Sequence, residues 1–307
     1  MDRREFLQRA AALAFMVGAG KHLTFPAELL AMAPEARPEP VLAQASGTNY
    51  AHLVGDAIQA LGGMKKFVNP NEVVVVKPNM AWDRTPELGA NTHPVVVRKI
   101  VELCLEAGAK KVKVLDHTCH DARRAYANSG IKAAVEEIKD PRAVVEYVDE
   151  RKFVELNVPR AKSLKKWSFY KDIMEADRFI NVPVAKHHSE ARLTMAMKNM
   201  MGAIGGWRGR IHVGLHQNIA DMNLLLRADL TVLDATRIMT QGGPSGGKPE
   251  YVQTKNLVIA GVDPVALDAY GTTTLFGLQP QDIGYISKGF ELGLGEMDIK
   301  KIKILSA

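Results

Sequence analysis

Two short apolar runs separated by one helical segment constrain the fold of this chain more than any other feature. Residues 72–77 read EVVVVK, and residues 112–115 form a second, mostly apolar run. Continuous apolar runs of this length are typical of strands buried on both faces of a parallel sheet. The intervening residues 94–107 have an amphipathic helical pattern, and Gly108 follows where a left-handed residue commonly ends a helix. Together these segments predict a right-handed βαβ unit.

The same alternation continues along the chain. Further strands are expected at residues 143–148, 178–182, 230–234, 256–260 and 299–305, and further helices at residues 51–61, 131–138, 194–201, 217–227 and 264–276. This order predicts an α/β fold with a mostly parallel sheet and helices on both faces. We expect residues 46–307 to form a single α/β domain, with two α/β lobes and a site between them as the alternative arrangement.

The first 45 residues have the pattern of an export signal. Arg3 and Arg4 lie within residues 2–8, which resemble the twin-arginine consensus. The apolar stretch 10–20 is shorter than the roughly 20 residues that a membrane span needs. Small residues at 43–45 predict cleavage before Ser46, and no Cys stands there to carry a lipid anchor. An amphipathic N-terminal helix kept in the mature chain is the alternative.

A twin-arginine signal predicts where the protein works. We expect a periplasmic or otherwise extracytoplasmic protein, with the twin-arginine export machinery as a partner and no stable membrane span in the mature chain. This route carries proteins that are already folded, often because a cofactor is loaded in the cytoplasm. The signal therefore favours a metal ion or pre-loaded cofactor, whose identity the sequence leaves open.

Net charge and cysteine content restrict the classes of ligand that the protein is expected to bind. The net charge of +6 suits a small anionic ligand, and no Lys/Arg run with interleaved aromatic residues favours a nucleic acid. Cys104 and Cys119 are the only cysteines, so a self-contained iron-sulfur cluster with four Cys ligands is excluded. The predicted helix and strand place these two cysteines at opposite ends of the layer, beyond the ~7 Å that a disulfide can bridge. Two free thiols are expected.

Residues 184–202 place Lys186, His187, His188, Lys198 and Asn199 within an otherwise apolar stretch. Cations are seldom buried without an anionic partner, because removing water from a charged group costs several kcal/mol. The segment therefore predicts an anion-binding or catalytic pocket. A solvated helix end is the alternative.

Polar residues follow the ends of five predicted strands. Ligands of open α/β sheets collect beyond the carboxyl ends of the strands, so these residues are expected to share one site. The candidates for ligand or cofactor binding are Lys77, Asn79, Lys186, Asn199, Asp234, Gly242, Gly243, Asp263 and Asp268. The stretch 116–121 after the second strand adds His117 and His120, together with Asp116.

Three of these side chains are candidates for catalysis. His117 and His188 can act as bases that take a proton from a carbon next to a carboxylate. A desolvated Lys198 would be a better nucleophile and could bind a carbonyl or a phosphate, while Lys77 and Lys186 could neutralise substrate anions. The alternative for each lysine is an exposed surface position.

Two further stretches have weaker signals. His212 and His216 are four residues apart, which would make half of a divalent-metal site if the segment were helical; a structural role is the alternative. Residues 205–210 read GGWRGR, typical of a mobile loop whose arginines could close over an anion. The Gly-rich residues 240–248 could cradle a phosphate but lack the spacing of a P-loop.

The motifs in order resemble a known family. VVVKPN at 74–79, NTHP at 91–94, EAGAKKVKVLD at 106–116, AKHH with MKNMMG at 185–202, IADMN at 219–223 and DPVALDA at 263–269 resemble the domain of unknown function 362 family over nearly all of the mature chain. Many members of that family are similar to iron-sulfur proteins because they append a Cys-rich ferredoxin-like segment. This sequence has no such segment, so the resemblance implies no electron-transfer role.

A fainter similarity connects the chain to the lactate racemase family, which uses a nickel-pincer nucleotide. His188 and Lys198 are ten residues apart and Gly202 follows, as in that family. The Gly-Thr-His turn of the family is replaced here by residues 116–120, where His117 or His120 would take the role, and the Gly-Gly before the Lys is replaced by residues 195–197.

Two classes of function remain open from the sequence. One is an exported enzyme acting on a small carboxylate or phosphate-bearing molecule. The other is a metal or iron-sulfur associated redox-accessory or binding protein that serves a membrane-associated partner.

Overall fold

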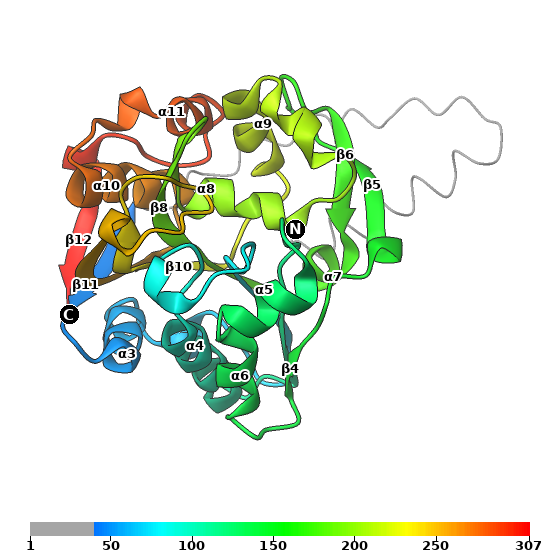
Figure 1. Ribbon diagram of the computed structural model, residues 1–307, viewed down its shortest axis with the longest axis vertical. Coiled ribbons are helices and arrows are strands. Elements are labelled where there is room, and N and C mark those ends of the chain that lie inside the picture. The colour runs from blue at the N-terminus through cyan, green and yellow to red at the C-terminus, as the bar shows by residue number, and fades with distance from the viewer. Residues whose placement is uncertain (1–39) are drawn as a thin grey trace.

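A ten-stranded mixed sheet forms the centre of the computed structural model, which describes residues 40–307 (Figure 1). Eight of its strands run in the order β12-β1-β11-β10-β7-β2-β3-β4, and the other two, β8 (Val184–His188) and β9 (Arg192–Thr194), form a hairpin in which β8 also pairs with β10. The bounds are β1 Val41–Ser46, β2 Val73–Pro78, β3 Lys111–Val114, β4 Ala143–Val145, β7 Arg178–Val182, β10 Leu230–Met239, β11 Val252–Gly261 and β12 Lys303–Ser306. Strands β10, β7, β2, β3 and β4 are parallel, whereas β11 is antiparallel to both β10 and β1. The α/β class and the mostly parallel sheet are confirmed.

The predicted βαβ unit consists of β2, helix α4 (Pro94–Glu106) and β3. The Val74, Val75 and Val76 side chains of β2 are fully buried because the strand has a neighbour on each side and helices on both faces. Helix α4 begins at Pro94, and the His93 side chain accepts a hydrogen bond from the Val95 N–H. Gly108 follows the end of α4 with a φ of 96°, and a Cβ there would lie 3.2 Å from Pro70.

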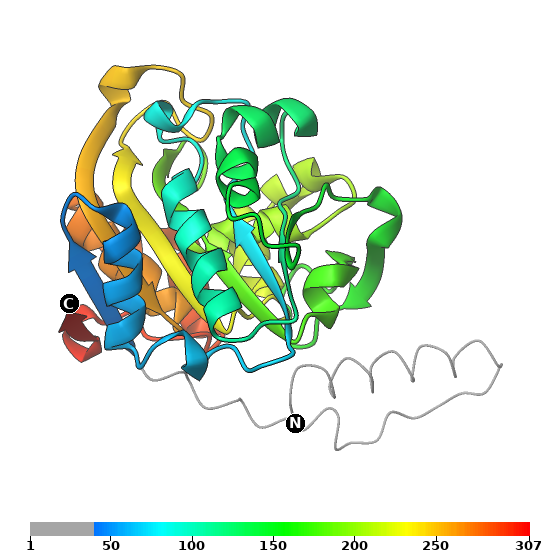
Figure 2. The same ribbon diagram turned by 90° about the horizontal axis from the view of Figure 1, so that it is seen from below.

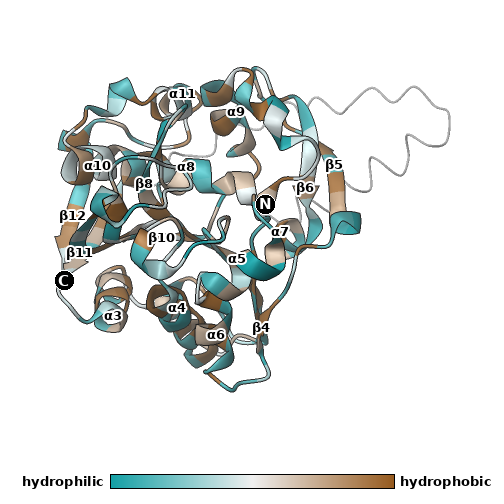
Figure 3. Ribbon diagram, viewed as in Figure 1, coloured by the Kyte–Doolittle hydropathy of each residue, from teal (hydrophilic) through white to brown (hydrophobic). Residues whose placement is uncertain are grey.

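Helices cover both faces of the sheet, as the sequence predicts. One face carries α3 (Tyr50–Ala60), α4, α5 (Ala122–Asn128) and α6 (Ile131–Glu136), and the other carries α8 (Ala196–Asn199), α9 (Leu215–Met222), α10 (Pro264–Phe276) and α11 (Gly284–Glu291) (Figure 1). Figure 2 shows α3 (blue) and α4 (teal) side by side on one face of the sheet. Brown and teal residues alternate along α4 and α6 in Figure 3, as expected for helices with one face on the sheet.

The two faces have separate apolar cores. Val232 and Val258 belong to the core under α3 and α4, whereas Leu233 and Ile259, next along the same strands, belong to the core under α9 and α10. Successive side chains of a strand point to opposite faces, so each long strand contributes to both cores.

Several elements differ from the sequence prediction. The expected helix 194–201 is the short α8 followed by the 3-10 helix η4 (Met200–Ala203), and residues 184–188, expected to follow a strand, are themselves a strand. Two hairpins were not predicted: β5 (Phe153–Asn157) with β6 (Lys166–Tyr170), and β8 (Val184–His188) with β9 (Arg192–Thr194). The remaining short elements are α7 Lys171–Glu175, η1 Met64–Lys66, η2 Pro86–Leu88, η3 Glu150–Lys152, η5 Arg208–His212, η6 Pro249–Tyr251, η7 Pro280–Asp282 and η8 Ile299–Lys301.

Strand β1 includes the residues at which cleavage was expected. Leu42 pairs with Gly261 of β11 on one side and with Ile304 of β12 on the other, and the Leu42 side chain is fully buried. The small residues 43–45, read from the sequence as a cleavage pattern, therefore lie inside the sheet. A cut before Ser46 would remove nearly all of β1. Residues 3 and 4 and the apolar stretch 10–20 lie outside the described residues.

Two smaller expectations concern cysteines and the membrane. Cys104 is buried in α4 and Cys119 is exposed, and both thiols are free, as predicted. Burial raises the pKa of the Cys104 thiol well above its ordinary value. None of the helices within residues 40–307 has the length and apolar character needed to cross a bilayer.

Candidate functional site: buried lysines at the switch point of the sheet

The strand order reverses direction next to β2. From β2 the chain moves outward through β3 to β4, and the next sheet strand, β7, returns to the opposite side of β2. The carboxyl ends of β2 and β7 thus form a topological switch point, where open α/β sheets commonly bind ligands. Lys77 pairs in register with Asn181 of β7 at this point.

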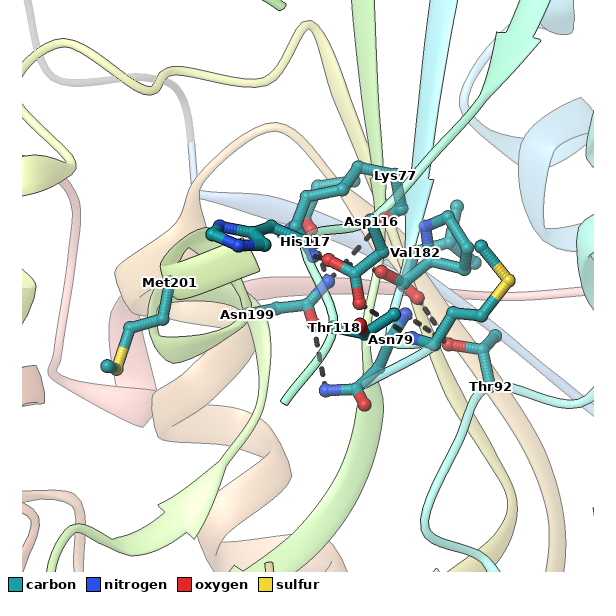
Figure 4. Close-up of polar contacts among 12 residues, drawn as sticks. Lys77, Asn79, Thr92, Asp116, His117, Thr118, Val182, Asn199 and Met201 are labelled. Atoms are coloured by element: carbon teal, nitrogen blue, oxygen red, sulfur yellow. Dashed lines mark hydrogen bonds and ion pairs between the residues drawn. The ribbon is translucent and has the colours of Figure 1, made fainter. Parts of the chain in front are cut away.

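Lys77 is neutralised inside the protein. Its Nζ lies 2.7 Å from Asp116 Oδ1, both side chains are almost completely buried, and Nζ also donates to the Pro78 carbonyl at 2.9 Å (Figure 4). The other Asp116 oxygen accepts the Met80 N–H at 2.7 Å. A Cβ on Gly202 would lie 1.8 Å from Asp116 Oδ1, so only glycine leaves room for this ion pair. Lys77 therefore already has a counterion within the protein.

A row of amides connects the switch point to α8. Asn79 Nδ2 donates to Asn199 Oδ1 at 3.0 Å (Figure 4). Asn199 Nδ2 in turn donates to Asn181 Oδ1 at 2.8 Å. Asn181 Nδ2 completes the row by donating to the Ala196 carbonyl at 3.0 Å. All three asparagines are buried. Each amide is oriented by the next, so the row fixes the position of α8 over the strand ends.

Lys186 points from β8 towards this row. Its Nζ donates to Asn79 Oδ1 at 3.2 Å and to the Ala90 carbonyl, and lies 5.7 Å from the ring centroid of Trp82. The side chain is 1% exposed. Burial, with smaller contributions from the charges of Lys198 and Lys77, lowers the Lys186 pKa to about 7.

Lys198 is the second buried amine, presented by α8. Its only hydrogen-bond contact among the described residues is with the Met201 sulfur, at 3.3 Å. Burial lowers the Lys198 pKa to about 8, and the Arg208 charge contributes in the same direction. The two N–H groups at the start of α8, those of Ala196 and Met197, donate to the Asp268 carboxylate at 2.6 and 3.0 Å, which anchors the helix that carries Lys198.

Neither of these two lysines has a carboxylate partner. Within residues 40–307, no Asp or Glu oxygen lies within 4.0 Å of Lys186 Nζ or Lys198 Nζ. A buried cation without a counterion is unfavourable, and a bound anion would remove the cost.

His188 lies beside the two lysines. Its Nδ1 accepts hydrogen bonds from the Glu190 and Ala191 N–H groups at 3.1 and 3.2 Å, so the ring proton is carried by Nε2. Burial and the charges of Lys198 and Lys186 lower the His188 pKa to about 2. His188 is therefore neutral at ordinary pH and keeps an Nε2–H donor.

An open hollow of about 450 Å³ has His188 in its wall. It lies over the β8–β9 hairpin and is also lined by His187, Arg192, Thr240 and Gln253. Its polar lining and its cationic neighbours suit a small polar molecule better than an apolar one.

The Gly-rich residues 242–243 close one side of β8 instead of forming a free phosphate cradle. The Gly243 N–H donates to His187 Nδ1 at 3.1 Å, and a Cβ on Gly243 would lie 1.8 Å from the His187 carbonyl oxygen. Gly242 has a φ of 65° and packs on the Tyr251 ring. The N–H of Gly243 is thus already used within the protein.

The other predicted catalytic histidine, His117, has both ring nitrogens engaged elsewhere. Nδ1 contacts the Ile204 carbonyl at 2.8 Å, and Nε2 lies 3.1 Å from the Glu150 carboxylate. The ring packs on Phe153 of β5. The structure gives His117 partners on the β5–β6 side, and its role as a base stays a prediction.

The two histidines of the predicted metal half-site have separate surroundings. His212 Nδ1 lies 2.7 Å from the Glu190 carboxylate, whereas the His216 ring stacks on Tyr285 with its centroid 6.4 Å away. His212 lies in η5 and His216 in α9, so the helix assumed for the spacing does not include both. No group of three or more His, Cys, Asp or Glu side chains suited to a metal ion occurs in the described part of the chain.

Three acidic residues that were predicted to bind a ligand or cofactor accept hydrogen bonds from backbone N–H groups. Asp234 accepts the His93 N–H at 2.7 Å and also the N–H and hydroxyl of Thr236. Asp263 accepts the N–H groups of Ala266 and Glu296, both at 2.8 Å, and so caps α10. Asp268, as described above, caps α8. All three carboxylates position elements around the site, and their predicted role in ligand binding stays a prediction.

The loop of residues 205–210, which was expected to be mobile, makes defined hydrogen bonds through one of its arginines. Arg208 donates to the His117 carbonyl at 2.8 Å and to the Thr118 carbonyl, which ties η5 to the turn after β3. Trp207 beside it is 75% exposed.

Sequence reasoning missed two members of the site. Asp116 was noted only as part of the turn after β3, and its pairing with Lys77 had no local signal. Asn181 lies within an apolar strand, where a single buried amide in the run RFINV was the available signal.

Fold and site together define an α/β protein with uncompensated buried amines at the switch point of its sheet. The chain belongs to the family described as Domain of unknown function (DUF362), which matches residues 74–273. The resemblance inferred from the motifs is confirmed.

Relatives and solved structures of known origin are similar to parts of the chain. The Thylakoid-associated protein sll1697 of Synechocystis sp. is 28% identical over 245 residues, covering 77% of this chain and 73% of that protein. The lactate racemase apoprotein of Thermoanaerobacterium thermosaccharolyticum matches with 13% identity and a TM-score of 0.44, covering 79% of this chain and 57% of its own. A Thermotoga maritima protein matches with 11% identity and a TM-score of 0.42, covering 61% and 51%. The chain thus spans little more than half the length of these two solved structures.

Proposed function

We propose that this protein binds a small anion bearing a carboxylate or a phosphate at the switch point between β2 and β7, and acts on it as an enzyme. The observation that carries the proposal is the pair of buried amines, Lys186 and Lys198, without a carboxylate partner among the described residues. Lys77 is excluded from this role because Asp116 already neutralises it.

The surroundings of the amines support anion binding. Lys186 uses two acceptors and keeps one N–H free, Lys198 faces a thioether, and His188 supplies a neutral Nε2–H. An anion placed among these groups would gain charge-assisted hydrogen bonds in a nearly water-free site, where such bonds are strongest.

The test is thermal unfolding with inorganic phosphate, sulfate and malonate as probes. At 100 times its Kd a bound anion stabilises by about 2.7 kcal/mol, which for a chain of this size raises Tm by roughly 5–10 °C. The rise should be larger at pH 6 than at pH 9, because Lys186 and Lys198 lose their charges at about pH 7 and 8. Lys198→Met should remove most of the rise.

The matched control is Lys65→Met, which changes an exposed lysine far from the site in sequence and should keep the full shift. An equal rise of Tm in Lys198→Met and the unchanged protein, or no rise with any of the three anions, would contradict the proposal.

We also propose that the chain is exported by the twin-arginine route and works outside the cytoplasm. Support comes from Arg3 and Arg4 and the apolar stretch 10–20. Because β1 is paired on both edges, the exported chain should begin before Val41. N-terminal sequencing of protein recovered after export checks this, and a chain that starts at Ser46 and is still folded would show that the sheet tolerates the loss of β1.

A further inference from the structure

The Lys198 amine has the surroundings of a nucleophile. It is held on α8, whose start is capped by Asp268, and 94% of its residue surface is removed from solvent, since it is 6% exposed. Its partner among the described residues is the thioether of Met201, a weak acceptor that does not hold a charged ammonium firmly. By contrast, Lys77 is bound to a carboxylate and Lys186 to a carbonyl and an amide oxygen.

We propose that Lys198 forms an imine with the carbonyl carbon of a small 2-oxo acid, whose carboxylate lies beside Lys186. This inference rests on the proposed anion site and names the class of molecule that enters it. The lowered pKa of Lys198, about 8, supports it, because a much larger fraction of the amine is neutral near pH 7.5 than for an exposed lysine.

The reaction balances without another reactant. The lone pair of the neutral Lys198 nitrogen attacks the carbonyl carbon, a C–N bond forms, and the carbonyl oxygen becomes a hydroxyl. The C–O bond then breaks as water leaves, and both hydrogens of that water come from the amine. No redox step is involved, and the product is an imine attached to Nζ.

Neighbouring groups favour a 2-oxo acid over a simple aldehyde or ketone. A carboxylate bound beside Lys186 raises the pKa of that amine above its value in the empty site, so Lys186 supplies the cation for the carboxylate, and it is fixed by Asn79, which the amide row orients in turn. The neutral His188 carries its proton on Nε2 and so can donate to an oxygen of the ligand. The near-complete burial of both amines limits the ligand to a few carbon atoms.

Reductive trapping tests the proposal. The full chain is incubated with pyruvate at pH 7.5, sodium cyanoborohydride is added, and the modified lysines are mapped by mass spectrometry of peptides. The reduced adduct should form on Lys198 about tenfold or more faster than on exposed lysines of ordinary pKa. It should be absent in Lys198→Arg, weakened in Lys186→Met, and unchanged in Lys65→Met. Acetone, which has no carboxylate, should label Lys198 far less than pyruvate does.

The outcomes separate this inference from the proposed function. Labelling spread evenly over surface lysines, or no adduct on Lys198 in the unchanged protein, overturns the imine. If phosphate still raises Tm in that case, the anion site stands and only the imine is lost. If neither the Tm rise nor the adduct is found, both ideas fail together. The decisive peptide map comes from the unchanged protein, so the test remains valid even if a variant folds poorly.

Discussion

Replacing Asp116 by alanine is expected to destabilise the fold by roughly 3–5 kcal/mol, because it leaves the Lys77 ammonium buried without its counterion. The two charged atoms are 2.7 Å apart, and the Lys77 side chain is fully buried. The substitution also leaves the Met80 N–H without its acceptor. Urea unfolding followed by circular dichroism measures the loss as a lower midpoint at an unchanged slope.

A double substitution tests whether the expected loss of stability comes from the Lys77–Asp116 pair. Lys77→Met together with Asp116→Ala removes both charges, so the double variant should regain a large part of the stability lost in Asp116→Ala alone. Lys77→Met alone should also be destabilising, because it strands the carboxylate. Additive effects of the two single substitutions would mean that the pair does not interact as its geometry indicates. Asp149→Ala, which removes a carboxylate from a solvent-exposed pair with Arg151, should change stability little.

Lys186→Met is expected to remove a rise of stability with pH. Burial lowers the Lys186 pKa from 10.5 to about 7 in the folded protein. Below pH 7 both folded and unfolded chains carry the charge, so the full cost of burying it is present. Between pH 7 and 10.5 the folded protein has released the proton while the unfolded chain keeps it, so stability rises with pH. Over the whole window the contribution is at most roughly 5 kcal/mol, at 1.36 kcal/mol per pKa unit.

The measurement compares unfolding free energies at pH 6.5, 8 and 9.5 in buffers free of phosphate and carboxylates. The free energy of the unchanged protein minus that of Lys186→Met should grow with pH by several kcal/mol. Taking this difference cancels the titrations of groups that Lys186 does not influence. Lys65→Met should show no such trend, and a flat difference for Lys186→Met would mean that Lys186 keeps an ordinary pKa in the fold.

Local pattern was enough to predict the framework of the fold. The four valines of residues 73–76 predicted a strand buried on both faces. The Pro at 94 and the Gly at 108 predicted the two ends of the helix that follows. Helix α10 and strand β7 were predicted with the bounds that the structure has. In each case the information lies in neighbouring residues of the chain, where propensity and periodicity act.

The site was predicted in part, because the rule of strand ends located several of its members but did not indicate which side chains contact one another. The rule of strand ends identified Lys77, Asn79 and Lys186, and all three meet at the switch point. It could not indicate that Asp116 neutralises Lys77, because that contact depends on how closely Gly202 of a distant segment approaches. It also treated Asp263 as a ligand-binding group, whereas the structure shows its carboxylate capping a helix. An Asp that follows a strand can serve either role, so residue type and position do not distinguish the two.

Residues 184–188 show why local pattern fails near the site. The run VAKHH has two histidines and a lysine, which do not mark a strand, yet it forms β8 because β10 extends past β7 and offers it a free edge. The pairing of β1 was hidden in the same way. Its small residues have the composition of a cleavage pattern, and only partners more than 200 residues away reveal the strand.

The position of β1 between β11 and β12 means that a strand made early in synthesis gains its partners only late. Residues 41–46 are made early but find their last neighbour only when residues 303–306 have left the ribosome. Until then an apolar strand near the start of the protein has an open edge, which is the state most exposed to aggregation and to chaperones. Under the proposed twin-arginine export, in which the protein folds before it crosses a membrane, loss of residues 303–306 would leave this edge of β1 unpaired in the folded protein.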